Sequence, residues 1–388
     1  MKIPPVILLL VVAHIVFTGA RVTASLYALA NGASTFTVGV LMALFALVPM
    51  LTAVRAGKWL DRAGPRRPLL ASGALLLAGI TLPAAFPYPV ADIGPLLVGV
   101  ALIGTGQMLT QITVQDLVGR SAAPHERTVA FSWLALGASI SGFTGPVSAG
   151  FIIDHLGHRA AFAAFAVVTL AIFGLLYWLW SKFPDPTGAR SQDEDRPFFD
   201  LLREGPVRNI LITTTLISMS WDLQTFMVPV HGTRVGLTAS QIGLVLGSFA
   251  VATFSIRLAM PWLSRTYRQW QVLTFTLFTA AFSFMLMPML DSLLPLMSCA
   301  FLLGLGLGAA QPNVMSLLHE RTPEGRVGEA LGLRTTIMNS SHVVLPLVFG
   351  AAGAVIGAAA VFWIMATMLA GGGYASARRL PDERSKEQ

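Results

Sequence analysis

The chain has 388 residues, of which 54% are hydrophobic and 12% are charged, and its mean hydropathy is +0.69. These values exclude an ordinary water-soluble domain, which could not bury that much apolar surface. The formal net charge of +7 does not call for nucleic acid as a partner, because membrane proteins collect lysine and arginine on their cytoplasmic side. The single cysteine, Cys299, excludes an intramolecular disulfide.

Apolar runs of about 20 residues, the length of a helix that crosses a ~30 Å hydrocarbon layer, recur along the whole chain. They predict an all-α polytopic membrane protein with twelve transmembrane helices. The first run follows Lys2 as in a signal peptide, but it lacks a small-residue cleavage signature and continues past Arg21, so we interpret it as a helix. The predicted spans are 4–30, 36–57, 69–88, 92–116, 128–152, 159–181, 208–231, 239–262, 270–290, 293–317, 328–350 and 352–374.

Lysine and arginine fall almost entirely on one side of these spans, and the opposite loops carry only Arg159 and Arg234. The positive-inside rule assigns the basic side to the cytoplasm. We therefore expect a multi-pass protein of a bacterial inner membrane, with both termini cytoplasmic and its basic loops against lipid headgroups.

The first predicted span carries one polar stripe, because His14, Thr18, Arg21 and Ser25 recur at helical spacing. A charge at the centre of a span costs at least ~2.5–3.5 kcal/mol. Arg21 therefore marks a functional position.

The fourth predicted span places Gln107, Gln111 and Gln115 at intervals of four, and the tenth carries Gln311 and Asn313 at a matching place. Amides donate and accept hydrogen bonds. These side chains either hold a polar or zwitterionic solute or bond to other helices, and the sequence leaves both readings open.

The fifth predicted span contains Gly145, Pro146 and Gly150 among further small residues. A proline inside a helix removes one backbone hydrogen bond and permits a bend, and small residues allow close helix packing. We predict a helix-bend motif here, with ordinary small-residue packing as the alternative.

The longest polar segment divides the predicted spans six and six. We therefore predict four parts. They are an N-terminal six-helix bundle over 1–182, a cytoplasmic linker over 183–207, a C-terminal six-helix bundle over 208–376 and a cytoplasmic tail over 377–388.

Asp222 in the seventh predicted span is a second embedded charge, with Ser218 and Thr225 on its face. The first and seventh spans correspond in the two halves, so Arg21 and Asp222 lie at similar depth. We predict that they form an ion pair or near-pair that closes the outer side. In a sharper version Asp222 takes up a proton when the pair opens, since desolvation favours the neutral acid and a nearby arginine favours the carboxylate. The alternative is a static pair that stabilises packing.

Other cavity candidates lie in the seventh and eleventh spans. Trp221 can present an aromatic wall to an organic solute, and Asn339 and His342 add polar groups. His342 is either a proton carrier or a hydrogen-bonded structural residue. Met227 and His231 stand four apart and suit a soft metal such as Cu(I), but two ligands do not make a site, and we predict no metal centre.

The two halves repeat one another at an offset of about 200 residues. Gly39 matches Gly243 and Phe45 matches Phe249, and Gly104, Gly106, Gln111, Val114 and Leu117 match Gly304, Gly306, Gln311, Val314 and Leu317. A parallel repeat places two pseudo-symmetric six-helix bundles around a central cavity, with the substrate site at their interface.

The loop over 57–67, together with this repeat, resembles the signature loop of the major facilitator superfamily, and the resemblance covers nearly the whole chain. It implies a secondary transporter whose loop locks and releases a cytoplasmic gate. Asp61 can meet a helix N-terminus, and the arginines can fix the loop at the anionic membrane surface. The gating residues implied are Gly57, Asp61, Arg62, Gly64, Arg66 and Arg67.

The segment from Gly145 to Gly150 resembles the glycine-proline motif of proton-coupled drug antiporters in that superfamily, with several glycines replaced by serine or alanine. The arginine that many of them carry early in the fourth span is missing, and Val100 occupies about that place. The resemblance therefore favours export only modestly. The resemblance to the superfamily also implies that the glutamines of the fourth and tenth spans border the central cavity.

Three classes of function are compatible with this pattern: a secondary transporter, a membrane-embedded enzyme and a non-transporting receptor. No nucleophile elbow, phosphate-binding glycine loop or zinc-type cluster appears in the sequence. We expect a monomeric transporter of a small organic solute, without enzymatic activity or cofactor, driven by the proton gradient. Proton-coupled efflux competes with import of a metabolite, siderophore or organic anion, and copper import is a weaker alternative.

Overall fold

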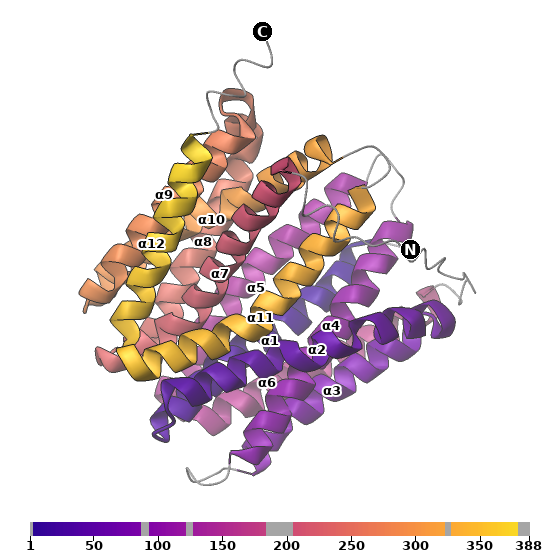
Figure 1. The fold of residues 1–388 in the computed structure, drawn as a ribbon. Helices are drawn as coiled ribbons and strands as arrows, with labels where there is room; N and C mark the ends of the chain where they lie inside the picture. Colours follow the sequence, from indigo (N-terminus) through magenta and orange to yellow (C-terminus); the bar gives the residue numbers. More distant parts are fainter. Residues whose placement is uncertain (1–2, 87–92, 122–126, 184–204, 323–326, 379–388) are drawn as a thin grey trace.

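The computed structural model describes residues 3–86, 93–121, 127–183, 205–322 and 327–378, and these form helices and no strand. Two short 3-10 turns, Trp180–Lys182 and Met287–Met289, accompany the long helices. The predicted linker and tail fall mainly on 184–204 and 379–388, outside the described residues. The long helices are α1 (Ile3–Ala30), α2 (Thr35–Ala63), α3 (Arg66–Ala85), α4 (Gly94–Ser121), α5 (Arg127–Leu156), α6 (His158–Leu179), α7 (Gly205–Arg234), α8 (Ala239–Thr266), α9 (Gln269–Leu286), α10 (Leu293–Arg321), α11 (Val327–Ile356) and α12 (Ala358–Ala377) (Figure 1).

Eleven of these helices are long and apolar enough to cross a membrane, and α7 is not among them. Polar side chains are concentrated on α7, and Ser218, Asp222 and Gln224 are buried inside the protein. The low hydropathy of α7 thus reflects side chains turned toward other helices, as expected for a span that borders a polar interior.

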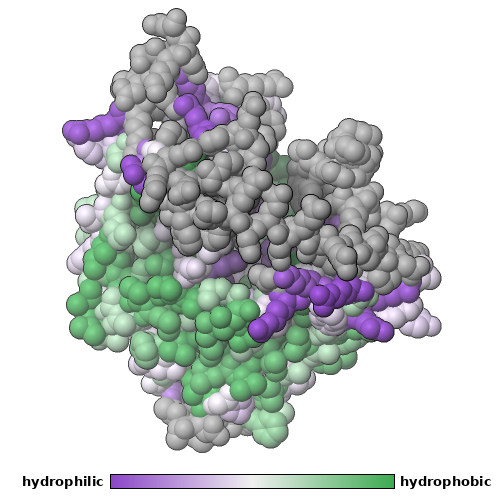
Figure 2. Space-filling view, turned by 45° about the vertical axis from the view of Figure 1, so that its right-hand side comes forward, coloured by the Kyte–Doolittle hydropathy of each residue, from purple (hydrophilic) through white to green (hydrophobic). Residues whose placement is uncertain are grey.

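Large apolar side chains cover the outside of the bundle. Tyr177, Leu294, Val167 and Phe275 are among the most exposed. Figure 2 shows a broad hydrophobic surface bordered by hydrophilic residues. Exposed apolar area of this extent fits contact with lipid.

The helices form two groups, α1 to α6 and α7 to α12, which lie mainly on opposite sides of the molecule and meet near its centre (Figure 1). The main contacts between the groups are α5 against α8 and α2 against α11. The bundles converge where α2 begins and α11 ends. The exact domain limits at 183–207 stay a prediction.

The predicted break between the last two spans, at 350–352, is wrong. The structure continues α11 to Ile356 and breaks it at Gly357, which has a φ of +86°. Gly157 makes the same break between α5 and α6 with a φ of +83°. Only glycine adopts such a φ without strain, so the repeat offset of 200 residues identifies the correct boundary.

One side of the bundle, where α2 and α8 begin and α5 and α11 end, is closed by close helix contacts; we call it the closed side. A Cβ added at Gly39 on α2 would collide with the carbonyl oxygen of Pro346 on α11. A Cβ at Gly243 on α8 would likewise meet the carbonyl of Pro146 on α5. The two interfaces thus repeat the same glycine-on-proline contact.

The α5–α8 interface has an additional electrostatic contact on the closed side. The Asp154 carboxylate accepts hydrogen bonds from the backbone N–H groups of Ala239 at 3.0 Å and Ser240 at 2.8 Å. These are the first residues of α8, where the helix dipole favours a negative charge. On the opposite side, which we call the open side, Gln111, Gln311 and Thr335 are exposed between the halves.

Replacing Gly357 by alanine should lower the free energy of unfolding by about 1–3 kcal/mol, because its φ of +86° and ψ of 154° lie in a region that is sterically strained for alanine. Gly371→Ala is the matched control, since Gly371 lies inside α12 and no atom would touch an added Cβ. Thermal unfolding in detergent should show a lower midpoint for Gly357→Ala and an unchanged or higher one for Gly371→Ala. Equal midpoints would contradict the assignment of the break.

Replacing Gly243 by leucine should force the closed side apart, because the side chain cannot fit against Pro146. Spin labels at His155→Cys and Thr233→Cys, both exposed on the closed side, report the separation in a Cys299→Ser background. Pulsed EPR should show longer distances with Gly243→Leu than with Gly174→Leu, whose site on α6 is open. Unchanged distances would show that this contact does not hold the closed side.

Candidate functional site

A central cavity lies between the two halves and opens toward the open side. Three connected lobes of about 340, 610 and 250 Å³ share His14 of α1 in their lining. Each lobe is lined by residues of both halves. A space of this size and position suits a small solute.

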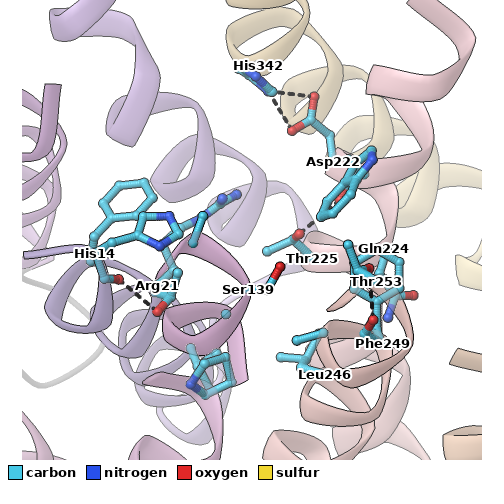
Figure 3. Close-up of a pocket in the computed structure, with 18 of the residues that line it drawn as sticks. His14, Arg21, Ser139, Asp222, Gln224, Thr225, Leu246, Phe249, Thr253 and His342 are labelled. Atoms are coloured by element: carbon cyan, nitrogen blue, oxygen red, sulfur yellow. Dashed lines mark hydrogen bonds and ion pairs between the residues drawn. The ribbon is translucent and has the colours of Figure 1, made fainter. Parts of the chain in front are cut away.

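Asp222 and His342 form a hydrogen-bonded pair in this cavity (Figure 3). Nδ1 of His342 on α11 lies 2.7 Å and 3.0 Å from the two carboxylate oxygens of Asp222 on α7. Asp222 is buried, whereas the His342 side chain is 37% exposed. The pair therefore places an ionisable imidazole where water from the cavity can reach it.

The prediction was an ion pair or near-pair between Arg21 and Asp222, and the structure, which describes both residues, shows no direct contact between the two charges. The carboxylate is bonded to His342, and no hydrogen bond joins it to Arg21 among the described residues. Arg21 lies on the opposite wall with His14, both on α1 (Figure 3). The two charges share the cavity without touching, so the roles predicted for Arg21 and Asp222 in gating and proton coupling stay predictions.

The Arg21 guanidinium is held by aromatic rings. Its Cζ lies 5.7 Å from the ring centroid of Phe17 and 6.0 Å from that of Phe45, within range of cation–π attraction. Its Nε is buried and has no hydrogen-bond partner among the described residues. The charge is therefore stabilised by aromatic faces and not by a carboxylate in contact.

The cavity has one edge-to-face aromatic pair in each half. Phe17 meets Phe45 at 5.6 Å with an interplanar angle of 87°, and Trp221 meets Phe249 at 4.8 Å and 86°. The repeat offset of 204 residues converts the first pair into the second. Trp221 was predicted as an aromatic wall, and Phe45 and Phe249 were predicted as repeat mates. Nothing in the sequence indicated that these residues belong to two equivalent aromatic pairs.

The glutamine and asparagine side chains predicted to border the cavity do line it, with one exception. Gln107, Gln111 and Gln115 line two of its lobes, Gln311 lines two lobes from the other half, and Asn339 lines the largest. Asn313 lines none of the three lobes. Its Nδ2 donates to the carbonyl of Ala309 in its own helix at 2.7 Å.

Two cavity residues were missed by the sequence analysis. Gln224 on α7 is buried, lines the lobe around Trp221, and neither its amide nitrogen nor its oxygen has a partner among the described residues. Arg257 on α8 donates from Nη1 to the hydroxyl of Ser139 on α5 at 3.0 Å and to the carbonyl of Ala135 at 3.3 Å. Arg257 lies inside a predicted span, so its charge was the signal that could have identified it.

The predicted gating loop lies at the open side. Arg66 donates from Nη2 to the carbonyl of Phe183 at 3.2 Å, and its Cζ lies 5.7 Å from the Trp180 ring. Gly64 ends α2 with a φ of +71°. Arg62 and Arg67 are exposed, and an added Cβ at Gly57 would touch nothing. The Asp61 side chain lies outside what the structure describes, so the gating role stays a prediction.

The predicted helix-bend residues lie at close contacts of α5. A Cβ added at Gly145 would collide with Thr18 of α1, and one at Gly150 with the carbonyl of Ala239 at the start of α8. Pro146 lies inside a continuous α5. The structure therefore assigns close packing to these residues, and the bend stays a prediction.

Met227 and His231 are buried in the second half. The Nε2–H of His231 donates to the carbonyl of Leu290 at 3.0 Å, so this nitrogen is already engaged. Among the described residues, no cluster of three or more histidine, cysteine, aspartate or glutamate side chains could hold a metal ion.

Comparison with known proteins agrees with this architecture. The sequence matches the Major Facilitator Superfamily over residues 6–344 and over 210–388. Tetracycline resistance protein, class B, of Escherichia coli is 25% identical over 325 residues, which cover 80% of this chain and 77% of that protein.

Solved structures give the same fold. A POT family transporter in complex with a thioalcohol-conjugated peptide has a TM-score of 0.78 at 12% identity, over 98% of this chain and 96% of that chain. A POT family transporter in complex with 5-aminolevulinic acid has the same TM-score and coverage at 13% identity. At such identities the likeness concerns the fold alone. With the family match over most of its length, the chain belongs to the Major Facilitator Superfamily of transporters.

Proposed function

We propose that this protein is a proton-coupled exporter of a small organic solute, which works by alternating access in a bacterial inner membrane. The observation that carries the proposal is the Asp222–His342 pair inside the cavity between the halves. An imidazole hydrogen-bonded to a carboxylate can accept a proton from water and pass it on. Because the pair lies in the cavity, it exchanges protons with the side of the membrane to which the cavity is open.

The coupling uses the two nitrogens of His342. In the neutral imidazole the Nδ1–H donates a hydrogen bond to the Asp222 carboxylate, which leaves Nε2 as the nitrogen that accepts a further proton. Each proton moved inward supplies about 1.4 kcal/mol per pH unit and ~2.3 kcal/mol per 100 mV. Solute and proton then compete for the polar groups of one cavity, and their exchange drives the cycle.

Two observations bear on the direction of transport, and the second favours export. The loop of basic residues at the end of α2, with Arg62 and Arg67 exposed, lies on the open side, which the positive-inside rule makes cytoplasmic. The cavity of this structure is therefore accessible to a solute in the cell. The relative from Escherichia coli is a resistance protein, and resistance is consistent with removal of a compound. Import of an organic anion is the second candidate, favoured by the positive charge of Arg21 in the cavity.

Reconstituted vesicles can test the coupling and the direction. Release or accumulation of a panel of labelled organic solutes is measured with and without an imposed pH gradient, and again with the gradient collapsed. Gradient-driven movement against the proton flow establishes export. Movement with the protons establishes import, and transport that ignores the gradient overturns proton coupling.

Asp222→Asn should reduce the rate of gradient-driven transport at least about 10-fold, because the neutral amide cannot stabilise the positive charge of an imidazolium as the carboxylate does. Solute exchange between equal pools, which needs no net proton movement, should persist. Asp291→Asn is the control, since Asp291 is exposed outside the cavity. Full gradient-driven transport by Asp222→Asn would remove the pair from the coupling mechanism.

A further inference from the structure

We propose that the solute is an organic anion with a flat apolar body, whose anionic group binds Arg21 and whose body lies between the two aromatic pairs. This inference rests on the proposed transport function. It assigns the chemical class of the solute, which the family does not specify.

The charges of the cavity call for an anion. Its two larger lobes are lined by three arginines, Arg21, Arg257 and Arg334, and among their described lining residues Asp222 is the one acidic side chain. With neutral histidines the lining therefore carries a net charge of +2, from three positive charges and one negative. A low-dielectric wall strengthens the attraction of such a lining for an anion.

Asp222 already has a hydrogen-bond partner, whereas two of the arginines each retain a buried nitrogen that has none among the described residues. Both oxygens of Asp222 lie within hydrogen-bond distance of His342. Arg21 and Arg334 each have a buried Nε without a hydrogen-bond partner among the described residues. A cationic solute would meet these guanidinium groups before it could displace His342, whereas an anion would supply the acceptors that they lack.

Arg21 has the form of an anion anchor. Its planar guanidinium offers a fork of N–H donors that matches the two oxygens of a carboxylate, and Phe17 and Phe45 restrict its position. Buried amides surround the same space, with Gln107 and Gln224 lacking partners for atoms that could bond to a solute. The site is thus built from fixed polar groups within an apolar wall.

The aromatic pairs define the body of the solute. Phe17 and Phe45 come from one half, and Trp221 and Phe249 come from the other. A flat apolar group between them contacts both halves at once. Arg334 lies about two turns from the open-side end of α11 and lines the largest lobe with Arg21, so positive charge continues from the open side to the anchor.

Binding measurements on the purified protein in nanodiscs test the inference apart from transport. The probes are aromatic and aliphatic mono- and dicarboxylates, each paired with its uncharged amide and with a trimethylammonium analogue of the same body. Thermal stabilisation and calorimetry should show that aromatic acids bind the wild type at least about 10-fold more tightly than their amides. Arg21→Gln should reduce acid affinity about 10- to 100-fold and leave amide affinity unchanged.

Two further variants make each outcome decisive. Arg21→Lys keeps the charge without the fork and should retain part of the acid preference, which guards against loss of folding in Arg21→Gln. Arg234→Gln, an exposed arginine outside the cavity, should bind as the wild type does. No preference for any acid, preference for the cations, or an acid preference unchanged by Arg21→Gln would each overturn the inference. Selective acid binding without gradient-driven transport would instead reject the proposed function and leave this inference standing.

Discussion

A guanidinium or carboxylate loses its hydration when a helix carries it into a bilayer, and it is stable there only beside compensating groups or water. In this protein Arg21, Asp222, Arg257 and Arg334 all line the space between the halves. The arrangement concentrates the embedded charges in one cavity. The lipid-facing surface is left to side chains such as Tyr177 and Leu294. The chemistry of the protein therefore lies at the interface between the halves.

The internal repeat fixes the shape of this cavity but not its polarity. The aromatic pairs of the two halves have nearly the same geometry, and the glycine-on-proline contacts of α2–α11 and α5–α8 correspond. The charges do not repeat: at the offset of 204 residues, Arg21 corresponds to Thr225 and Asp222 to Thr18. A symmetric apolar frame thus holds Arg21 on the wall of one half and the Asp222–His342 pair on the wall of the other. A solute anchored at Arg21 would therefore face the Asp222–His342 pair across one cavity.

Much of the fold follows from the sequence, because hydropathy and the repeat act over whole spans. The twelve helices, the six-plus-six packing order and the place of Arg21, His14 and the glutamines in the interior are readable in this way. The hydrogen-bond partner of Asp222 cannot be predicted from the sequence in this way. Helical periodicity gives the depth and face of a residue but not the rotation of α11 against α7, which decides that His342 and not Arg21 meets the carboxylate. The same limit concealed the local bond of Asn313 and the unpartnered amide of Gln224.

The closed side is asymmetric in one respect. Asp154 ties the end of α5 to the start of α8, whereas its repeat mate at the end of α11 is Ala354, which has no charge to offer α2. The α5–α8 interface therefore combines close packing with a charge–dipole contact, whereas the α2–α11 interface has close packing without that contact. Because the α2–α11 interface lacks this charge–dipole contact, we expect it to separate more readily than the α5–α8 interface when the cavity opens to the other side of the membrane.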